Sequence, residues 1–176
     1  QLQDDISSLE RCRKPVIAAI HGACIGGGID LVTAADIRFA SADAYFAVRE
    51  IDMGMTADVG TLQRLPRIVG EGVARELCLT GRRIDAAEAA QLKLVNQVFD
   101  SQDALLAHAR QVAASIAGKS PLAVRGTKQV LNYSRDHSVA DSLEYVANWN
   151  AAMLLSNDIQ QAVMASMSKR TAQFAD

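Results

Sequence analysis

The spacing of apolar residues divides the chain into a first third of short strands and a remainder of helices. Residues 16–20 form an uninterrupted apolar run, which is typical of a buried strand. Segments 36–40, 45–48 and 94–99 have the composition of further short strands bounded by turn residues. Segment 49–60 contains two glycines and lacks a clear periodicity, so we expect a loop there.

Apolar residues recur at helical intervals through most of the sequence after Gly70. The pair Ser120-Pro121 is typical of a helix start, because a capping serine precedes a proline in the first turn. Asp85 and Glu88 have the spacing of a helix cap. We predict helices over about residues 70–81, 101–117 and 120–131. We also predict a helix that ends near residue 13 and helices that begin near residues 61, 85, 138 and 156.

A glycine-rich turn, residues 22–28, follows the first strand and precedes a short apolar helix over residues 31–35. Three consecutive glycines let the backbone turn sharply and leave its N–H groups uncovered by side chains. Uncovered N–H groups at a helix start attract negative charge. The segment lacks the lysine of a P-loop and the spacing of a dinucleotide-binding fingerprint. We predict a turn that stabilises an oxyanion; the alternative is a turn that only packs the helix closely onto the strand.

Three carboxylates are candidates for proton transfer near this turn. Asp30 alone could be a first-turn charge favoured by the helix dipole, and Glu50 and Asp58 alone could be solvated loop acids. Combined with the glycine turn, they suggest hydrogen-bond donors that hold a developing charge and acids that move protons. His21 is close to Cys24 in sequence, but without a third orienting group we favour a histidine packed at the strand end.

Composition and charge narrow the functional classes. The 176 residues are 49% hydrophobic with a formal net charge of −2, which suits a globular domain and gives no basis for a nucleic-acid or membrane surface. No apolar run approaches the roughly 18 residues that span a bilayer. The three cysteines are widely spaced, which favours free thiols in a reducing compartment over a disulfide framework or a zinc site.

An ordered series of motifs resembles the enoyl-CoA hydratase/isomerase (crotonase) superfamily. The series comprises residues 14–30, 35–38, 46–50, 60–66, 79–81 and 86–94. The resemblance implies an α/β fold of the ClpP/crotonase type, a spiral of ββα units. It also implies that residues 1–118 form the C-terminal part of this core and residues 119–176 a helical trimerisation region. Members normally have several strands before the Lys14-Pro15 motif, with the second oxyanion donor and part of the coenzyme A pocket, so we expect the chain to be N-terminally truncated.

The acids favour one branch of the superfamily. Hydratases have glutamates at the positions of Asp30 and Glu50 and glycine at position 58, whereas Asp30, Glu50 and Asp58 together resemble the Δ3,5-Δ2,4-dienoyl-CoA isomerases. The resemblance implies an isomerase that converts 3,5-dienoyl-CoA to 2,4-dienoyl-CoA in fatty-acid β-oxidation. Glu50 would act at C2, Asp58 would act at C6, Asp30 would hold the geometry or tune its neighbours, and Gly27 would donate to the thioester oxygen.

The resemblance also implies the partners of the protein. Ala23, Ile25 and Gly26 would contact the acyl-CoA thioester. Coenzyme A is part of that substrate, so we expect no cofactor and no metal. We expect a homotrimer or hexamer that binds neither nucleic acid nor membrane, in the cytoplasm of a bacterium or in the mitochondrial or peroxisomal matrix of a eukaryote.

Two other functions remain as alternatives. A 2-enoyl-CoA hydratase is disfavoured by Asp58. A non-catalytic member that binds RNA or another partner is disfavoured by the slightly negative net charge and the complete set of acids.

Overall fold

The computed structural model describes residues 1–174, which divide into two compact units. Unit 1 contains residues 1–12 and 16–111, and unit 2 contains residues 13–15 and the chain after residue 111. The division lies within one long helix, α6 (Gln102–Ala117). The domain boundary expected between residues 118 and 119 stays a prediction.

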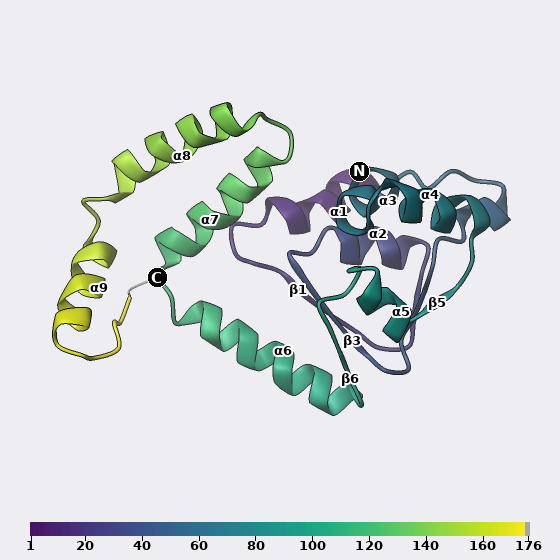
Figure 1. Cartoon of the computed structure of the whole chain (residues 1–176), viewed down its shortest axis with the longest axis horizontal. Helices are drawn as coiled ribbons and strands as arrows, with labels where there is room; N and C mark the ends of the chain where they lie inside the picture. The colour runs from purple at the N-terminus through teal and green to yellow at the C-terminus, as the bar shows by residue number, and fades with distance from the viewer. Residues whose placement is uncertain (175–176) are drawn as a thin grey trace. The chain divides into compact units, whose positions relative to one another are not determined.

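Two three-stranded sheets form the frame of unit 1 (Figure 1). One sheet is entirely parallel, in the order β1, β3, β6; in the other, β4 pairs parallel with β2 and antiparallel with β5. The strands are β1 (Ile17–Ile20), β2 (Ala23–Ile25), β3 (Ile37–Ser41), β4 (Tyr45–Ala47), β5 (Ile84–Asp85) and β6 (Gln97–Phe99). Strands β1 to β4 alternate between the two sheets, and a helical segment follows each of the pairs β1–β2 and β3–β4, so the predicted spiral of ββα units is confirmed. Strand β5 then stays in the sheet of β4, and β6 returns to the other sheet.

Helices follow the strand pairs in unit 1 and account for most of unit 2. Unit 1 contains α1 (Leu2–Arg11), α2 (Gly27–Thr33), a 3₁₀ helix η1 (Glu50–Met53), α3 (Thr61–Val69), α4 (Glu71–Thr80) and α5 (Ala86–Gln91). After α6, unit 2 contains α7 (Pro121–Ser134), α8 (Val139–Met153) and α9 (Asn157–Met167). None of the helices that the structure describes has the length and apolar character needed to cross a bilayer.

Hydrogen bonds at the caps confirm three of the predicted helix starts, those near residues 85, 120 and 138. Asp85 Oδ1 accepts from Glu88 N–H at 2.8 Å at the start of α5, and Ser120 Oγ accepts from Ala123 N–H at 3.1 Å at the start of α7. Ser138 begins α8 with a capping box. These caps use atoms a few residues apart, so the local sequence contains all that is needed to form them.

Two strands differ from the prediction because their formation depends on distant partners. Residues 23–25 were expected within the glycine turn but form β2, which pairs with β4 and buries Cys24. β5 has only two residues and no periodic signal, and it exists because Ile84 pairs with Phe46. Both strands therefore result from the assembled sheet.

The core of unit 1 lies among the two sheets and the helices of the same unit. Its large members are almost completely buried: Ile29, Phe46, Leu65, Ile84 and Leu94. Burial of each such side chain contributes about 1.5–3 kcal/mol relative to an exposed position. Ile29 belongs to this core from α2, so packing fixes the helix that follows the glycine turn.

Candidate functional site

The turn between β2 and α2 is made at Gly26. Its φ angle is +54°, its N–H donates to Ala47 O at 3.0 Å, and its carbonyl accepts from Ile29 N–H at 2.7 Å. A Cβ atom at this position would lie 3.2 Å from Glu50 Oε1. The left-handed backbone and the close approach of a carboxylate both require glycine here.

Gly27 is the first residue of α2, so its N–H has no acceptor within the helix. It is exposed, and no heavy atom lies within 4 Å of the position that a Cβ would take. In β2, Ala23 and Ile25 are exposed while Cys24 points into the core. The predicted binding residues Ala23, Ile25 and Gly26 and the predicted oxyanion donor Gly27 therefore lie along one accessible segment.

Glu50 lies beside this segment because β4 and η1 bring it to the turn. Its Oε2 atom is buried and makes no hydrogen bond within residues 1–174. A buried carboxylate oxygen without a donor is unfavourable in a folded protein, and such groups are often functional. Burial raises the pKa of the Cys78 thiol on α4, and the negative charge of Glu50 adds to this effect. The Glu50 carboxylate thus lies close both to the glycine turn and to α4.

Asp30 is held differently from Glu50. It is 1% exposed, and its Oδ1 accepts two hydrogen bonds from Thr61, at 2.6 Å from the backbone N–H and at 2.7 Å from the hydroxyl. Thr61 is fully buried and is the first residue of α3, so Asp30 caps α3 from a different helix. The sequence reasoning missed Thr61, although a hydroxyl residue directly after Gly60 at a helix start was an available signal.

Asp58 lies between η1 and α3 and is exposed. Its backbone carbonyl accepts a hydrogen bond from Gln3 Nε2 at 2.6 Å. Among the described residues, no hydrogen bond or ion pair occupies its carboxylate, which leaves both oxygens available. The structure therefore joins Asp30 to the start of α3 and Glu50 to the glycine turn, and it leaves Asp58 free in the segment between them.

His21 does not pair with Cys24. Its Nδ1 lies 3.1 Å from both Ser41 Oγ and Asp43 Oδ1, and its side chain is 45% exposed, so the expectation of a packed histidine is wrong. Both contacts use the same ring nitrogen, whereas a catalytic relay uses the two nitrogens for different partners. We therefore assign His21 to the end of the sheet and not to the site.

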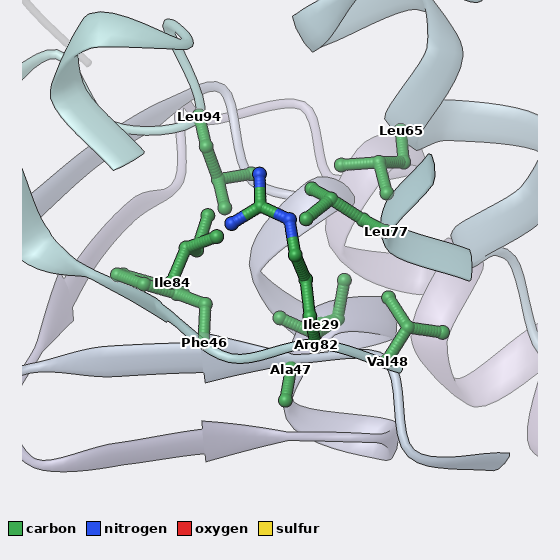
Figure 2. Close-up of a pocket in the computed structure, with 9 residues that line it drawn as sticks. All are labelled: Ile29, Phe46, Ala47, Val48, Leu65, Leu77, Arg82, Ile84 and Leu94. Atoms are coloured by element: carbon green, nitrogen blue, oxygen red, sulfur yellow. The ribbon is translucent and has the colours of Figure 1, made fainter. Parts of the chain in front are cut away.

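Figure 2 shows a small pocket in unit 1 with an almost wholly apolar lining. The lining residues are Ile29, Phe46, Ala47, Val48, Leu65, Leu77, Arg82, Ile84 and Leu94. The Arg82 guanidinium is held by two carboxylates, since Nε donates to Glu76 at 2.6 Å and a terminal nitrogen lies 2.7 Å from Glu88. With its cation already paired, this pocket offers no group for proton transfer.

No set of three or more potential metal ligands comes together within residues 1–174. The polar groups that lie at or beside the glycine turn are carboxylates and backbone N–H groups. The carboxylates of such a site can take a proton from one carbon of a substrate and return a proton to another carbon. Between these steps, the N–H groups can stabilise negative charge on a substrate oxygen.

Comparisons with known proteins identify similar chains. The profile of the family described as enoyl-CoA hydratase/isomerase matches residues 1–176. The chain is 56% identical over 99% of its length to the peroxisomal Δ(3,5)-Δ(2,4)-dienoyl-CoA isomerase of Arabidopsis thaliana, and covers 63% of that protein. It is 53% identical over 96% of its length to the mitochondrial Δ(3,5)-Δ(2,4)-dienoyl-CoA isomerase of Mus musculus, and covers 52% of that protein. The chain thus spans about half to two thirds of the length of these relatives.

A solved structure agrees with the fold. The crystal structure of an enoyl-CoA hydratase from Bacillus anthracis superposes with a TM-score of 0.95, at 32% sequence identity, over 98% of this chain and 67% of the other. The expected crotonase-type α/β fold is therefore confirmed.

Proposed function

The chain belongs to the enoyl-CoA hydratase/isomerase family, and from this premise we propose that the protein containing it is a Δ3,5-Δ2,4-dienoyl-CoA isomerase. The substrate is a 3,5-dienoyl-CoA thioester and the product is the 2,4-dienoyl-CoA. The names of the relatives that are 56% and 53% identical support this reaction. The observation that favours it within the site is the unoccupied carboxylate of Asp58, a second acid beyond Glu50.

The reaction needs one proton removed and one proton added at distant carbons. Removal of a proton from C2 leaves a negative charge that is delocalised from C2 to C6 and onto the thioester oxygen. Addition of a proton at C6 then places the double bonds at C2–C3 and C4–C5. The site must therefore supply a hydrogen-bond donor for the oxygen and two proton-transfer groups separated along the acyl chain.

Gly27 is our candidate for the donor. Its N–H has no acceptor within α2, and the space around it is open, so a thioester oxygen can approach closely. Ala23, Ile25 and Gly26 provide the accessible backbone on which the thioester would lie. Coenzyme A enters as part of the substrate, and the proposed steps use no cofactor or metal.

Glu50 is our candidate for the base at C2. Its Oε1 lies beside the glycine turn, and its buried Oε2 has no hydrogen-bond donor among the described residues. This oxygen can therefore contact the substrate without giving up a hydrogen bond to the protein. Family resemblance supports the same assignment, because hydratases use the glutamate at this position on C2.

Asp58 is our candidate for the acid at C6. It lies further along the segment that begins with Glu50, and its carboxylate is exposed. The hydratase of Bacillus anthracis has the same fold, so the fold alone would equally permit hydration of a 2-enoyl-CoA. A hydratase has no need for a proton carrier at C6, and for this reason we favour the isomerase.

The proposal is tested with the full-length protein and two substrates. With 3,5-dienoyl-CoA, we expect the absorbance of the conjugated 2,4-dienoyl thioester to grow. A much faster hydration of 2-enoyl-CoA by the same preparation would contradict the isomerase assignment and support the hydratase. Filter binding with RNA tests the non-catalytic alternative, and retention of RNA without turnover of either substrate would support it.

We further propose that the protein forms a homotrimer or hexamer. In unit 2, large apolar side chains are exposed on α8, on α9 and just after α8: Leu143, Leu154, Leu155, Val163, Met164 and Met167. Exposed apolar surfaces of this kind commonly bind a second copy of the same chain. The resulting homo-oligomer usually has closed symmetry. Light scattering at micromolar concentration checks this, and a monomer would contradict it.

The two relatives are named as peroxisomal and mitochondrial, which supports an organelle matrix if this chain is eukaryotic.

A further inference from the structure

The N-terminal helix α1 contacts the segment that contains Asp58. Gln3 Nε2 on α1 donates to the backbone carbonyl of Asp58 at 2.6 Å. The two residues are 55 positions apart in sequence, so this contact exists only in the folded protein. Figure 1 shows α1 on the same side of unit 1 as α2 and α3. The backbone of the proposed C6 acid is thus anchored by a helix that contains none of the catalytic candidates.

Arg64 on α3 contacts the two residues that follow Asp58. One terminal guanidinium nitrogen donates to the backbone carbonyl of Val59 at 3.4 Å. The same nitrogen lies only 1.7 Å from the position that a Cβ on Gly60 would occupy. Gly60 also has a φ angle of +135°, which disfavours other residues. The guanidinium therefore fills the concave side of the turn between Asp58 and α3.

Helix α1 holds this guanidinium in place. Arg64 Nε donates to Glu10 Oε2 at 2.9 Å, and its other terminal nitrogen donates to Ser7 Oγ at 2.8 Å. The Arg64 and Glu10 side chains are 13% and 18% exposed, so the ion pair is largely buried. Arginine alone can direct three nitrogens at separate acceptors from one rigid plane, which a lysine cannot do.

We propose that Arg64 is a positioning residue for Asp58. Anchored by Ser7 and Glu10, it fixes the backbone at Val59 and Gly60, and together with Gln3 this determines where the Asp58 carboxylate lies. Arg64 does not act on the substrate, and it acts on the reaction only through Asp58. This inference rests on the proposed function, in which Asp58 serves C6 and Glu50 serves C2.

The proposal predicts that loss of Arg64 separates the two proton transfers. In the full-length Arg64→Lys and Arg64→Gln variants, formation of 2,4-dienoyl-CoA should fall about 10–100-fold, because a displacement of about 1 Å at an acid can cost 10²-fold. Exchange of the C2 hydrogen with deuterated solvent should change less than about twofold, because it depends on Glu50. Backbone amides of residues 57–60 should exchange faster with deuterium than in the wild-type protein.

The control is Arg11→Gln. Arg11 is on the same helix, but its ion pair with Asp4 is exposed and does not contact the Asp58 segment, so product formation and amide exchange should both stay at wild-type values. If the Arg64 variants do not fold, Ser7→Ala and Glu10→Gln each remove one anchor and should give the same separation with a smaller amplitude.

Three results would overturn the proposal. Equal losses of C2 exchange and product formation would assign Arg64 a general structural role. A wild-type rate of product formation by the folded Arg64→Gln variant would show that Arg64 has no role in the reaction. Unchanged amide exchange over residues 57–60 in the Arg64 variants would show that Arg64 does not position this segment. This measurement does not depend on catalytic activity. It therefore tests the positioning role even if the wild-type protein does not isomerise dienoyl-CoA.

Discussion

Thr61 donates both its backbone N–H and its hydroxyl to the same oxygen of Asp30, at 2.6 and 2.7 Å, in a position where neither residue reaches solvent. This pair joins the first turn of α2 to the first turn of α3. It also fixes the C-terminal end of the segment that contains Glu50 and Asp58, because that segment ends where α3 begins. Asp30 therefore has a structural task that is separate from proton transfer.

The first prediction concerns this pair. Thr61→Val keeps the shape of the side chain and the backbone donor but removes the hydroxyl, so the free energy of unfolding should fall by about 1–3 kcal/mol because a buried acceptor loses a donor. Thr61→Ser keeps the hydroxyl and should lose less. Urea denaturation provides the measurement, and equal midpoints for the valine and serine variants would contradict the prediction.

The second prediction separates the two proposed proton carriers. Asp58→Asn should still exchange the C2 hydrogen with deuterated solvent but form little product, whereas Glu50→Gln should lose both activities. Each general acid or base contributes about 10²–10⁴-fold in rate, so both defects should be easy to measure. C2 exchange that survives in Glu50→Gln and disappears in Asp58→Asn would reverse the two assignments.

The third prediction tests the oxyanion donor. Gly27→Pro removes the N–H at the first position of α2, where a proline is sterically acceptable, so kcat should fall by about 10²–10³-fold. Gly27→Ala retains the N–H, and because the space for its Cβ is open it should remain much more active. The comparison of kcat between these folded variants is decisive: wild-type turnover by the proline variant would exclude Gly27 as the donor.

The fourth prediction concerns the packing of α7 and α8 in unit 2. A Cβ on Gly126 would lie 2.3 Å from Trp149 Nε1, so Gly126→Ala should destabilise unit 2 by about 1–3 kcal/mol. Trp149 is the single tryptophan of the chain, so its fluorescence reports the unfolding of this unit directly.

The matched control for this prediction is Gly72→Ala on α4. No heavy atom lies within 4 Å of the added Cβ, so alanine should be neutral or stabilise the protein by about 0.5–1 kcal/mol. Stabilisation by Gly126→Ala of the same size as the control would show that Trp149 does not pack against this glycine.

The fifth prediction is a pH dependence. Burial raises the pKa of the Cys24 thiol from 9.0 to about 12. The unfolded chain therefore ionises this thiol above pH 9 while the folded protein keeps it protonated, so stability falls as pH rises from about 9 towards 12. The loss approaches about 1.4 kcal/mol per pH unit in this range.

Denaturant unfolding at several pH values checks the sign and the source of this dependence. Cys24→Ala should flatten the decline above pH 9. Cys12→Ala, which changes an exposed thiol, should leave it unchanged. A decline of the same steepness in the wild-type protein and in Cys24→Ala would assign the effect to other groups.

The sequence by itself determined the elements that depend on neighbours along the chain. The capping box of Ser138 and Asp141 and the cap of Asp85 both involve atoms within a few residues of each other. The order of the motifs was also sufficient to indicate the family, which the profile match then confirmed.

The tertiary structure alone decided which distant groups meet. Residues 23–25 became a strand because β4 was available to pair with them. The contacts of Asp30 with Thr61, of Glu50 with Gly26 and of Arg64 with Glu10 join residues that are 24 to 54 positions apart. No local propensity encodes such contacts, because they form only when the packing of the core brings separate helices and strands together.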